Sequence, residues 1–344
     1  MWALSLSAHE IDAVQSLTHE IAREHKSIEE AEFIRRAVVY AHELPRRVRQ
    51  FLSDFKLLEP ACGVCMISGY PIDSARIGKT PGHWKWKLDA ATSLEEQIMF
   101  VLYGCLLGDP FAWATQQDGS LMHDVFPIEG NQYDQLGTGS EQLLWWHSED
   151  AFHPHRADYI GLMCLRNPDR VATTIGALDL SSLSPEHVDV LFQPRFLIKP
   201  DESHLEKNES DLRKQARGQG GDEVLDSAYE NINKLNSAPP KIPMLFGNRQ
   251  APYVRLDPFF TTPLDEEASA ALNALAKSID DNLQEVVLQP GDCFFIDNYR
   301  IVHGRKAFKA RYDGTDRWLK RLNFTRDLRK SHDSRGGCGM RVMM

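Results

Sequence analysis

Residues 290–308 read PGDCFFIDNYRIVHGRKAF, a pattern typical of a β protein. Their first residues complete a turn signal, QPGD at 289–292. The next run, CFFID at 293–297, predicts a buried strand, and RIVHG at 300–304 predicts a second strand that ends in glycine. Short runs rich in Val, Ile, Leu and Phe, separated by Gly, Pro, Asn and Asp, continue from Cys62 onward. The stretch therefore belongs to a chain of many short strands.

Eight other segments show the same strand pattern: 63–69, 159–165, 171–177, 194–200, 242–247, 251–256, 284–289 and 318–325. Only 93–108 and 265–283 have helical character between them. Many short strands with few helices predict a mainly β fold with peripheral helices (α+β), either a β-barrel or a β-sandwich with helices packed outside. Because there is no internal repeat and no clear linker, we expect one domain over residues 1–344.

Three regions differ from this β core, which we place at residues 61–330. Residues 1–60 predict a helical layer whose second helix ends at Pro45, with apolar side chains on single helix faces at Ile11, Val14, Leu17 and Ile21 and at Phe33, Ala37, Val38 and Ala41. Residues 201–241 are charged and poor in large apolar groups, so they form either a disordered surface or an active-site lid, and we favour the lid. The tail at 331–344 carries no readable structural pattern.

The composition narrows the partners and the compartment. A formal net charge of -10 argues against nucleic acid and anionic membranes, which attract basic surfaces. No apolar run approaches the ~20 residues that span a bilayer, and the N-terminus lacks a secretory signal pattern. Six scattered cysteines indicate reduced thiols in a cytoplasmic protein. Cys62 and Cys65 form a CxxC that could be half of a zinc site or a redox pair, but its strand-like context favours core cysteines.

A candidate metal site begins in LLWWHSED, residues 143–150. Side chains alternate along a strand, so His147 and Glu149 would point the same way and could bind adjacent corners of a metal ion. His303 is the best candidate for a third ligand. Two histidines and one carboxylate leave positions open, as in non-haem Fe(II) oxygenases. By itself, however, HxE is a weak signal that more often marks a surface pair.

Two further histidines, His153 and His155, are rival ligands. The proline between them favours a structural role instead.

A second signal lies in DRWLKRLNFTRD, residues 316–327. Strand alternation places Arg317, Leu319, Arg321 and Asn323 on one face and Trp318, Lys320, Leu322 and Phe324 on the other. If the arginine face is solvent-exposed, this is an outer strand. If it faces the interior, two guanidinium groups lie near the proposed metal, and buried arginines need anions. Because a guanidinium fork matches a carboxylate, this arrangement would require two carboxylates, one on a co-substrate and one on a substrate.

Together, HSEDAFHPHRADYIGLMCLRNPD at 147–169 and DNYRIVHGRKAFKARYDGTDRWLKRLNFTRD at 297–327 resemble the clavaminate synthase-like branch of the Fe(II)/2-oxoglutarate-dependent oxygenases. Within that branch the chain resembles enzymes that hydroxylate free arginine or related guanidino amino acids, including enduracididine, at the β-carbon. The resemblance covers most of the chain. It implies a double-stranded β-helix (jelly-roll, cupin-like) core, and a function in natural-product biosynthesis.

The resemblance also implies a set of metal and co-substrate residues. His147, Glu149 and His303 would bind Fe(II), and dioxygen would react there. Arg317 would bind the distal carboxylate of 2-oxoglutarate, with help from the hydroxyl of Thr173. Glu149 is expected to contact the substrate as well, and because related halogenases lack this carboxylate, its presence favours hydroxylation.

For the amino acid substrate, the resemblance implies a further group of residues. Gln116 and Arg321 match positions that hold the amino and carboxylate ends. Asp257 matches a position where an acid pairs with a cationic side chain, and Asp222 in the expected lid is a further candidate. Two simpler interpretations compete: Gln116 as a water-facing polar residue on a strand, and Asp257 as the start of a turn at Pro258.

One departure from the family pattern leaves the substrate open. Some arginine-oxidising relatives carry a pair of acids near Asp257, whereas here Arg255 and Leu256 precede a single acid. Cyclic or neutral side chains, and citrulline, lysine or asparagine, therefore remain alternatives. The same centre could desaturate the substrate, attack its γ-carbon or act on a carrier-tethered amino acid. A different class of function, a non-catalytic β-barrel binding protein that holds zinc, also remains.

Overall fold

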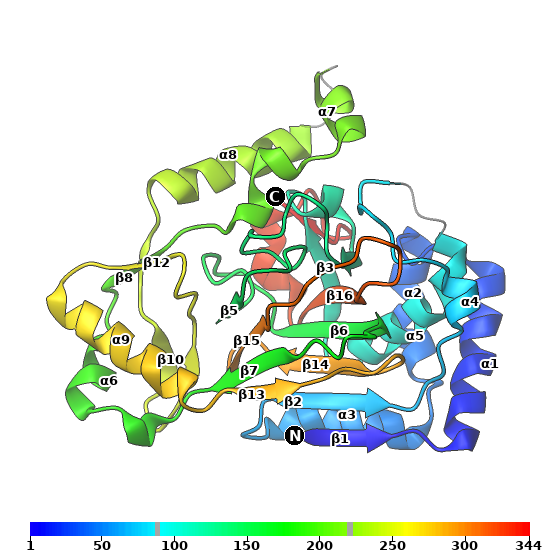
Figure 1. The fold of residues 1–344 in the computed structure, drawn as a ribbon, viewed down its shortest axis with the longest axis horizontal. Helices are drawn as coiled ribbons and strands as arrows, with labels where there is room; N and C mark the ends of the chain where they lie inside the picture. Colours follow the sequence, from blue (N-terminus) through cyan, green and yellow to red (C-terminus); the bar gives the residue numbers. More distant parts are fainter. Residues whose placement is uncertain (87–89, 219–222) are drawn as a thin grey trace.

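Two stacked β-sheets form the centre of the computed structural model, which describes residues 1–86, 90–218 and 223–344 (Figure 1). In these residues the larger sheet has the order β1 (Trp2–Ser5), β2 (Val64–Ser68), β14 (Cys293–Asp297), β6 (Tyr159–Arg166), β16 (Trp318–Thr325), β3 (Asp109–Trp113) and β17 (Val342–Met343), and β4 (His123–Val125) also pairs with β16. The smaller sheet has the order β13 (Gln284–Val286), β7 (Thr173–Ala177), β15 (Ile301–Arg305) and β5 (Leu144–His147). The fold is mainly β with peripheral helices, as predicted, and of the two arrangements considered the sandwich is observed.

The alternation of β6 and β16 separates two apolar cores. On β6, Ile160 and Leu162 pack between the two sheets, whereas Tyr159 and Met163 face the N-terminal helices. Strand β16 follows the same rule, because Leu319 lies between the sheets and its neighbours on the other face pack against the helices. Both faces of this sheet are therefore covered, and the side of β16 that carries Arg317 and Arg321 faces the space between the sheets.

The helical layer on the outer face of the larger sheet consists of α1 (Ala8–Glu24), α2 (Ala31–Ala41), α3 (Arg46–Leu58) and α5 (Leu94–Cys105), with the short α4 (Ser74–Ile77) beside them. Helix α1 begins with a capping box, in which Ser7 Oγ accepts from the Glu10 amide at 3.3 Å and Glu10 accepts from the Ser7 amide at 2.8 Å. Helix α5 is apolar on nearly every side, and α1 and α2 pack against it. Such a helix is stable only when it is enclosed.

Two details of the N-terminal region differ from the prediction. Val38 is 45% exposed although Phe33, Ala37 and Ala41 are fully buried. These three residues are spaced four apart and form a narrow apolar stripe, so the next residue after Ala37 turns away from it. Residues 2–5, assigned to the helical layer, instead form β1, which pairs in parallel with β2.

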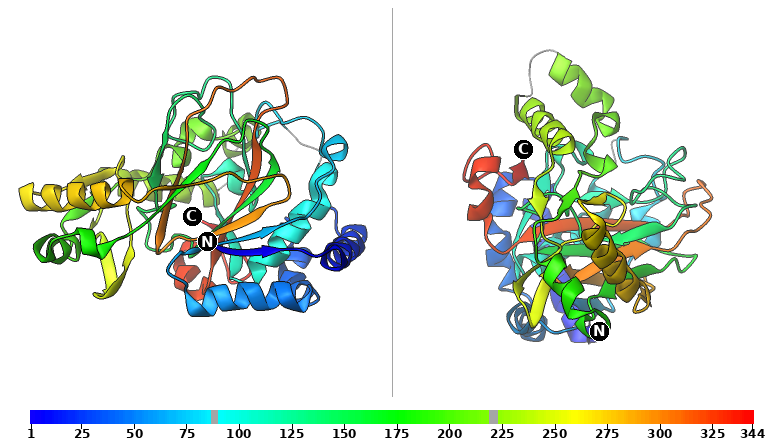
Figure 2. Two further views of the ribbon diagram at one scale, coloured as in Figure 1. Left: turned by 60° about the horizontal axis from the view of Figure 1, so that its bottom comes forward. Right: turned by 90° about the vertical axis from the view of Figure 1, so that its left-hand side faces the viewer.

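A second lobe is inserted between β7 and β13, and the left-hand view of Figure 2 shows it beside the central sheets. It contains α6 (Pro185–Leu191), α9 (Glu266–Asp280), a small sheet of β12 (Thr261–Pro263), β8 (Phe196–Ile198) and β9 (Lys241–Ile242), and a hairpin of β10 (Leu245–Asn248) and β11 (Ala251–Val254). Its own apolar core joins α6 to α9. Trp146 and Val302 belong to this core, so it supports the strands that carry the two predicted histidine ligands.

The described part of the segment 201–241 is largely helical, so the disordered alternative is wrong for those residues. It contains α7 (Asp211–Gly218) and α8 (Glu223–Ser237), which extend beyond the rest of the molecule in the right-hand view of Figure 2. Helix α8 buries Leu225 and Tyr229 against Ala114. This helix was missed because its buried residues, which recur about every four positions, lie in a segment that is otherwise rich in charged residues.

The C-terminal tail, in which the sequence shows no readable pattern, is also ordered. A 3₁₀ helix spans 328–334, and β17 pairs in parallel with β3, with Met343 1% exposed. A two-residue strand has no readable period, so only its pairing partner defines it. Among the described residues no helix combines the length and apolar character needed to cross a membrane.

Candidate metal and substrate site

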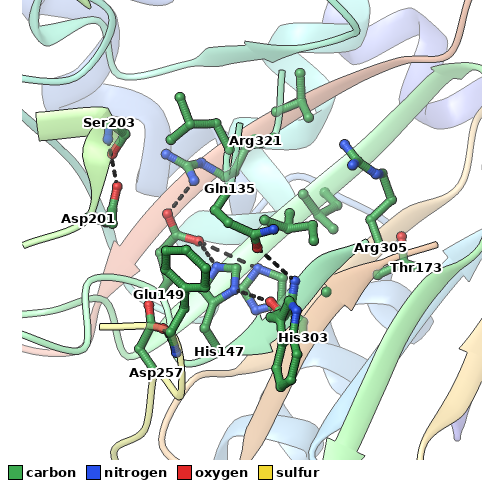
Figure 3. A pocket seen from close by; sticks show the side chains of 18 of the residues that line it. Gln135, His147, Glu149, Thr173, Asp201, Ser203, Asp257, His303, Arg305 and Arg321 are labelled. Carbon is green, nitrogen blue, oxygen red and sulfur yellow. Dashed lines mark hydrogen bonds and ion pairs between the residues drawn. The ribbon is translucent and has the colours of Figure 1, made fainter. Parts of the chain in front are cut away.

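The three predicted metal ligands meet between the sheets (Figure 3). His147 ends β5 and pairs in register with His303 on β15. Glu149 Oε2 lies 3.7 Å from His147 Nε2 and 3.5 Å from His303 Nε2. Alternation placed Glu149 on the strand, but the structure places it in the turn, two residues after the end of β5. The turn still directs its carboxylate toward both imidazoles.

Hydrogen bonds outside this cluster orient its members. His147 Nδ1 lies 2.8 Å from the Trp145 carbonyl, which directs Nε2 toward Glu149. The side chain of Asn298 holds the Glu149 backbone at both ends, at 2.7 Å from the amide and 3.0 Å from the carbonyl. Burial opposes ionisation, but Arg321 and the two imidazoles hold the pKa of Glu149 well below its usual value. Two imidazole nitrogens and one ionised carboxylate fit the donor set expected for Fe(II).

Two buried arginines form one wall of the cavity next to this cluster. Arg317 lies directly before β16, is 5% exposed, and its Nη2 is 3.3 Å from Thr173 Oγ1. Burial lowers the pKa of Arg317 to about 10, and burial together with Arg317 lowers that of Arg305 to about 9. Arg305 donates to backbone carbonyls, including Gln142 at 2.9 Å. Within the described chain neither guanidinium has an acidic partner, so this wall fits a dicarboxylate.

Arg321 connects the metal cluster to a second group of polar side chains. Its Nη1 donates to Glu149 Oε1, and its Nη2 lies 3.2 Å from Gln116 Oε1 and 2.8 Å from His123 Nδ1. Burial and the charge of Arg321 lower the pKa of His123 to about 3, so that imidazole is a neutral acceptor. Gln116 is 3% exposed and lies in the turn after β3, which rules out the water-facing strand alternative. Its Nε2 donates to Ser203 Oγ at 2.6 Å.

Asp257 lies on the other side of the cluster, where it starts a turn, as one interpretation predicted, and also faces the cavity. Its carboxylate lines the cavity and also accepts from the amides of Phe259 at 3.0 Å and Phe260 at 3.3 Å. Burial raises the pKa of Asp257 to about 6. Asp222, the other acid expected near the substrate, lies outside the described residues.

Several residues of the site escaped the prediction. Asp150, Asp201 and Ser203 line the cavity, and His204 lies next to it, close to Asp150 and Asp201. They come from the charged segment 201–241 and from the turn after Glu149, where no spacing rule predicts an inward side chain. A run of polar residues at the start of the expected lid was the only available signal.

The remaining metal candidates have other environments. His153 is not grouped with the described ligand atoms, and its ring packs edge-on against Trp113 with centroids 4.7 Å apart. Cys65 is fully buried on β2, whereas Cys62 is partly exposed, and neither is grouped with other described ligand atoms. The prediction of a buried core cysteine is therefore confirmed for Cys65 and not for Cys62.

Comparison with known proteins places this geometry in a family. The model of the taurine catabolism dioxygenase TauD, TfdA family matches residues 231–323. The chain is 43% identical to an enduracididine beta-hydroxylase of Streptomyces hygroscopicus over 100% of both chains, and 45% identical to an L-ornithine/L-arginine 3-hydroxylase of Catenulispora acidiphila over 96% of each. The crystal structure of the non-heme iron oxygenase OrfP with Fe, succinate and (3S)-hydroxy-L-Arg superposes with a TM-score of 0.93 at 47% identity, covering 99% of both chains. The protein belongs to the clavaminate synthase-like family of Fe(II)/2-oxoglutarate-dependent oxygenases.

Proposed function

We propose that this protein is an Fe(II)/2-oxoglutarate-dependent dioxygenase that hydroxylates the β-carbon of a free L-amino acid with a guanidino or other cationic side chain. One observation carries the proposal: the cavity at the metal cluster has walls of opposite charge. Arg305 lies on one side next to Thr173, to which Arg317 bonds, and Asp201 and Asp257 lie on the other side (Figure 3). The similarity to an enduracididine beta-hydroxylase, to an L-ornithine/L-arginine 3-hydroxylase and to OrfP bound to hydroxylated arginine supports the same reaction.

In this proposal His147, His303 and Glu149 hold Fe(II), and Arg317 with Thr173 binds the distal carboxylate of 2-oxoglutarate. The iron, with 2-oxoglutarate and dioxygen, supplies the oxidising power for the reaction. The protein supplies position and charge. Because Arg317 is buried and has no acidic partner among the described residues, a carboxylate arriving there gains a full charge-assisted hydrogen bond without displacing another of these acids.

The amino acid would be bound at three points, which decides which of its carbons faces the metal cluster. Arg321 binds the α-carboxylate, and Gln116 Oε1 together with Glu149 accepts from the α-amino group. Asp257 accepts from the cationic end of the side chain. A substrate fixed at both ends cannot slide along the cavity, so hydroxylation stays at one carbon.

The second acid in the cavity favours a cationic side chain over the neutral alternatives. The sequence around Asp257 contains a single acid, which left neutral side chains open. Burial raises the pKa of Asp257, and the charge of His147 lowers it. Asp201, from the segment 201–241, lies near enough to raise this pKa further. Two acids on one wall attract a guanidinium or ammonium group. We accordingly propose that 201–241 acts as a lid that completes the substrate site.

The test is a succinate-release screen with Fe(II), 2-oxoglutarate and dioxygen across free arginine, enduracididine, lysine, citrulline and asparagine, followed by product mass. Arginine or enduracididine should release succinate and gain one oxygen atom, and citrulline should be a weaker substrate because it lacks the charge. His303→Ala is the matched inactive control. If no free amino acid raised succinate release above the control, the proposal would be wrong.

We also propose the cytoplasm as the compartment. All six cysteines are free thiols in the structure, which supports a reducing environment. A protein that folded only under oxidising conditions would contradict this placement.

A further inference from the structure

The segment 201–241 begins with residues that reach the interior next to the site. His204 is fully buried, and its Nε2 lies 3.0 Å from Asp150 Oδ1. Its Nδ1 lies 2.7 Å from Thr115 Oγ1, so both ring nitrogens are engaged. One residue earlier, Ser203 Oγ accepts from Gln116 Nε2 at 2.6 Å. The start of the proposed lid is therefore bonded to two loops of the core.

Asp150 has an unusual backbone conformation directly after Glu149. Its φ is 49°, in the left-handed region that residues with a Cβ seldom adopt. Its buried carboxylate accepts from Trp113 Nε1 at 2.6 Å, from His204 Nε2 at 3.0 Å and from Gln116 Nε2 at 3.4 Å. A buried carboxylate needs such donors. His204 thus stabilises the strained turn that directs the Glu149 side chain toward the imidazoles.

The same bonds continue to the substrate residues. Gln116 is held by Ser203 and Asp150, and its Oε1 accepts from Arg321 Nη2 at 3.2 Å. Arg321 in turn donates to Glu149, which is the neighbour of Asp150 in the chain. The path is a closed ring of contacts. It links the first residues of the segment 201–241 to the substrate clamp, defined as Gln116, Arg321 and Glu149.

We propose that His204 is a positioning residue that couples docking of the segment 201–241 to the geometry of the substrate clamp. The inference rests on the proposed function, because the clamp is defined by amino acid binding. When the segment is docked, His204 holds Asp150 and Ser203 holds Gln116, so the clamp has its binding geometry. When the segment is displaced, both supports are lost together, and the amino acid is no longer fixed at its α-carbon end. Productive hydroxylation is thereby limited to the docked state.

The variant that tests this is His204→Phe, which retains a ring next to Trp113 and Phe152 but has no donor for Asp150. With L-arginine it should lower the ratio of hydroxylated product to succinate by about tenfold, since one buried hydrogen bond to a charged group is lost. It should raise KM for L-arginine and leave KM for 2-oxoglutarate unchanged. His204→Gln, which offers an amide donor toward Asp150, should restore most of the ratio.

The matched control is His19→Phe, the same substitution at an exposed histidine that lies outside the segment 201–241 and contacts Glu95. It should keep the wild-type ratio of product to succinate. Equal losses in His204→Phe and His19→Phe would overturn the inference, because the loss would then not depend on which histidine is replaced. A wild-type ratio in His204→Phe would also overturn it.

If His204→Phe does not fold, Thr115→Val replaces it, because it removes only the hydroxyl bonded to Nδ1. It should lower the ratio in the same direction by about threefold, the value of one neutral hydrogen bond, and an unchanged ratio would overturn the inference. Trypsin cleavage within 201–241 of the metal-free protein gives a readout without turnover and should be faster in the variant than in wild type. Wild-type protein that oxidised no amino acid would defeat the proposed function, whereas equal cleavage of variant and wild type would defeat this inference.

Discussion

Arg321 and Glu149 are joined by a hydrogen bond from Nη1 to Oε1, while Oε2 of the same carboxylate faces His147 at 3.7 Å and His303 at 3.5 Å. One side chain therefore belongs to the proposed metal site and to the substrate clamp at once. Because its pKa is held well below the usual value, mainly by Arg321 against the effect of burial, Glu149 is ionised at neutral pH. A substitution of Arg321 should therefore lower the amount of product formed per succinate, in addition to weakening substrate binding.

Arg321→Leu should uncouple the reaction. The variant keeps Arg317 and should bind 2-oxoglutarate with unchanged affinity, but the amino acid loses the partner of its carboxylate. We expect the product formed per succinate to fall by about tenfold or more. Arg321→Lys should recover only part of this, because an ammonium lacks the planar fork. Full product yield from Arg321→Leu at low amino acid concentration would contradict the clamp.

Arg317→Leu should chiefly weaken the co-substrate. Arg317 is buried and has no acidic partner in the described parts of the chain, so its guanidinium contributes most when a carboxylate arrives, and its removal should raise the Kd for 2-oxoglutarate by about 30-fold or more. Titration calorimetry of 2-oxoglutarate into the anaerobic Fe(II) protein measures this directly. Arg329→Leu, an exposed arginine, is the control. An unchanged Kd in Arg317→Leu would exclude its assigned role.

Asp257→Asn should discriminate between cationic and neutral substrates. It removes a charge and keeps the size of the side chain, so KM for arginine should rise by about tenfold while KM for citrulline changes little. Asp201→Asn should act in the same direction with a smaller effect, because the Asp201 side chain is 22% exposed and its charge is better screened. Equal effects on both substrates would show that Asp257 serves only its turn.

Arginine binding should depend on pH through the same carboxylate. Burial raises the pKa of Asp257 to about 6, so the group is charged above that pH and neutral below it. The affinity for arginine should fall as the pH is lowered from 7 to 5, and this extra pH dependence should be absent in Asp257→Asn. Calorimetric titrations of arginine into both proteins at matched pH values provide the comparison. Identical pH profiles would contradict the assignment.

Asp297→Asn should stabilise the protein at alkaline pH. Asp297 is 7% exposed, and burial raises its pKa to about 7, above its ordinary value of 3.8. The folded state binds this proton more tightly than the unfolded state, so the resulting stability is complete below about pH 4 and is lost as the pH rises to 7. The asparagine should raise the free energy of unfolding by about 1–3 kcal/mol at pH 8 and by less at pH 5. Urea unfolding at the two pH values measures it, and a constant difference would contradict the prediction.

Much of the fold could be predicted from local pattern. The alternation in β16 is confirmed, because Leu319 and Arg321 line the cavity while Trp318 and Phe324 pack toward the helices. Successive side chains of any strand point to opposite faces of the sheet, so the spacing of apolar and charged residues along β16 shows which of them share a face. Helices such as α1 and α5 were predicted because their apolar residues recur at helical spacing, which is also a local pattern. The strands β1 and β17 were missed because a short edge strand is defined by its partner more than by its own residues.

The site was predictable only in part. The grouping of His147, Glu149 and His303 followed from residue type and family resemblance, although Glu149 lies in a turn and not on the strand that alternation predicted. The inward direction of Arg317 followed from the family resemblance. The contact between Asp150 and His204 did not, since the two side chains come from a turn and from a charged segment without periodicity.

The sequence by itself determined which side chains could point inward, because alternation along a strand and apolar spacing along a helix are local properties. It also determined the chemistry on offer, two imidazoles with a carboxylate and a pair of arginines. Only the tertiary structure decided which distant groups share one interior, bringing Asp201 beside Asp257 and His204 beside Asp150. Such contacts depend on how separate loops dock on the sheets, and a buried polar group takes the partners that this docking places within reach.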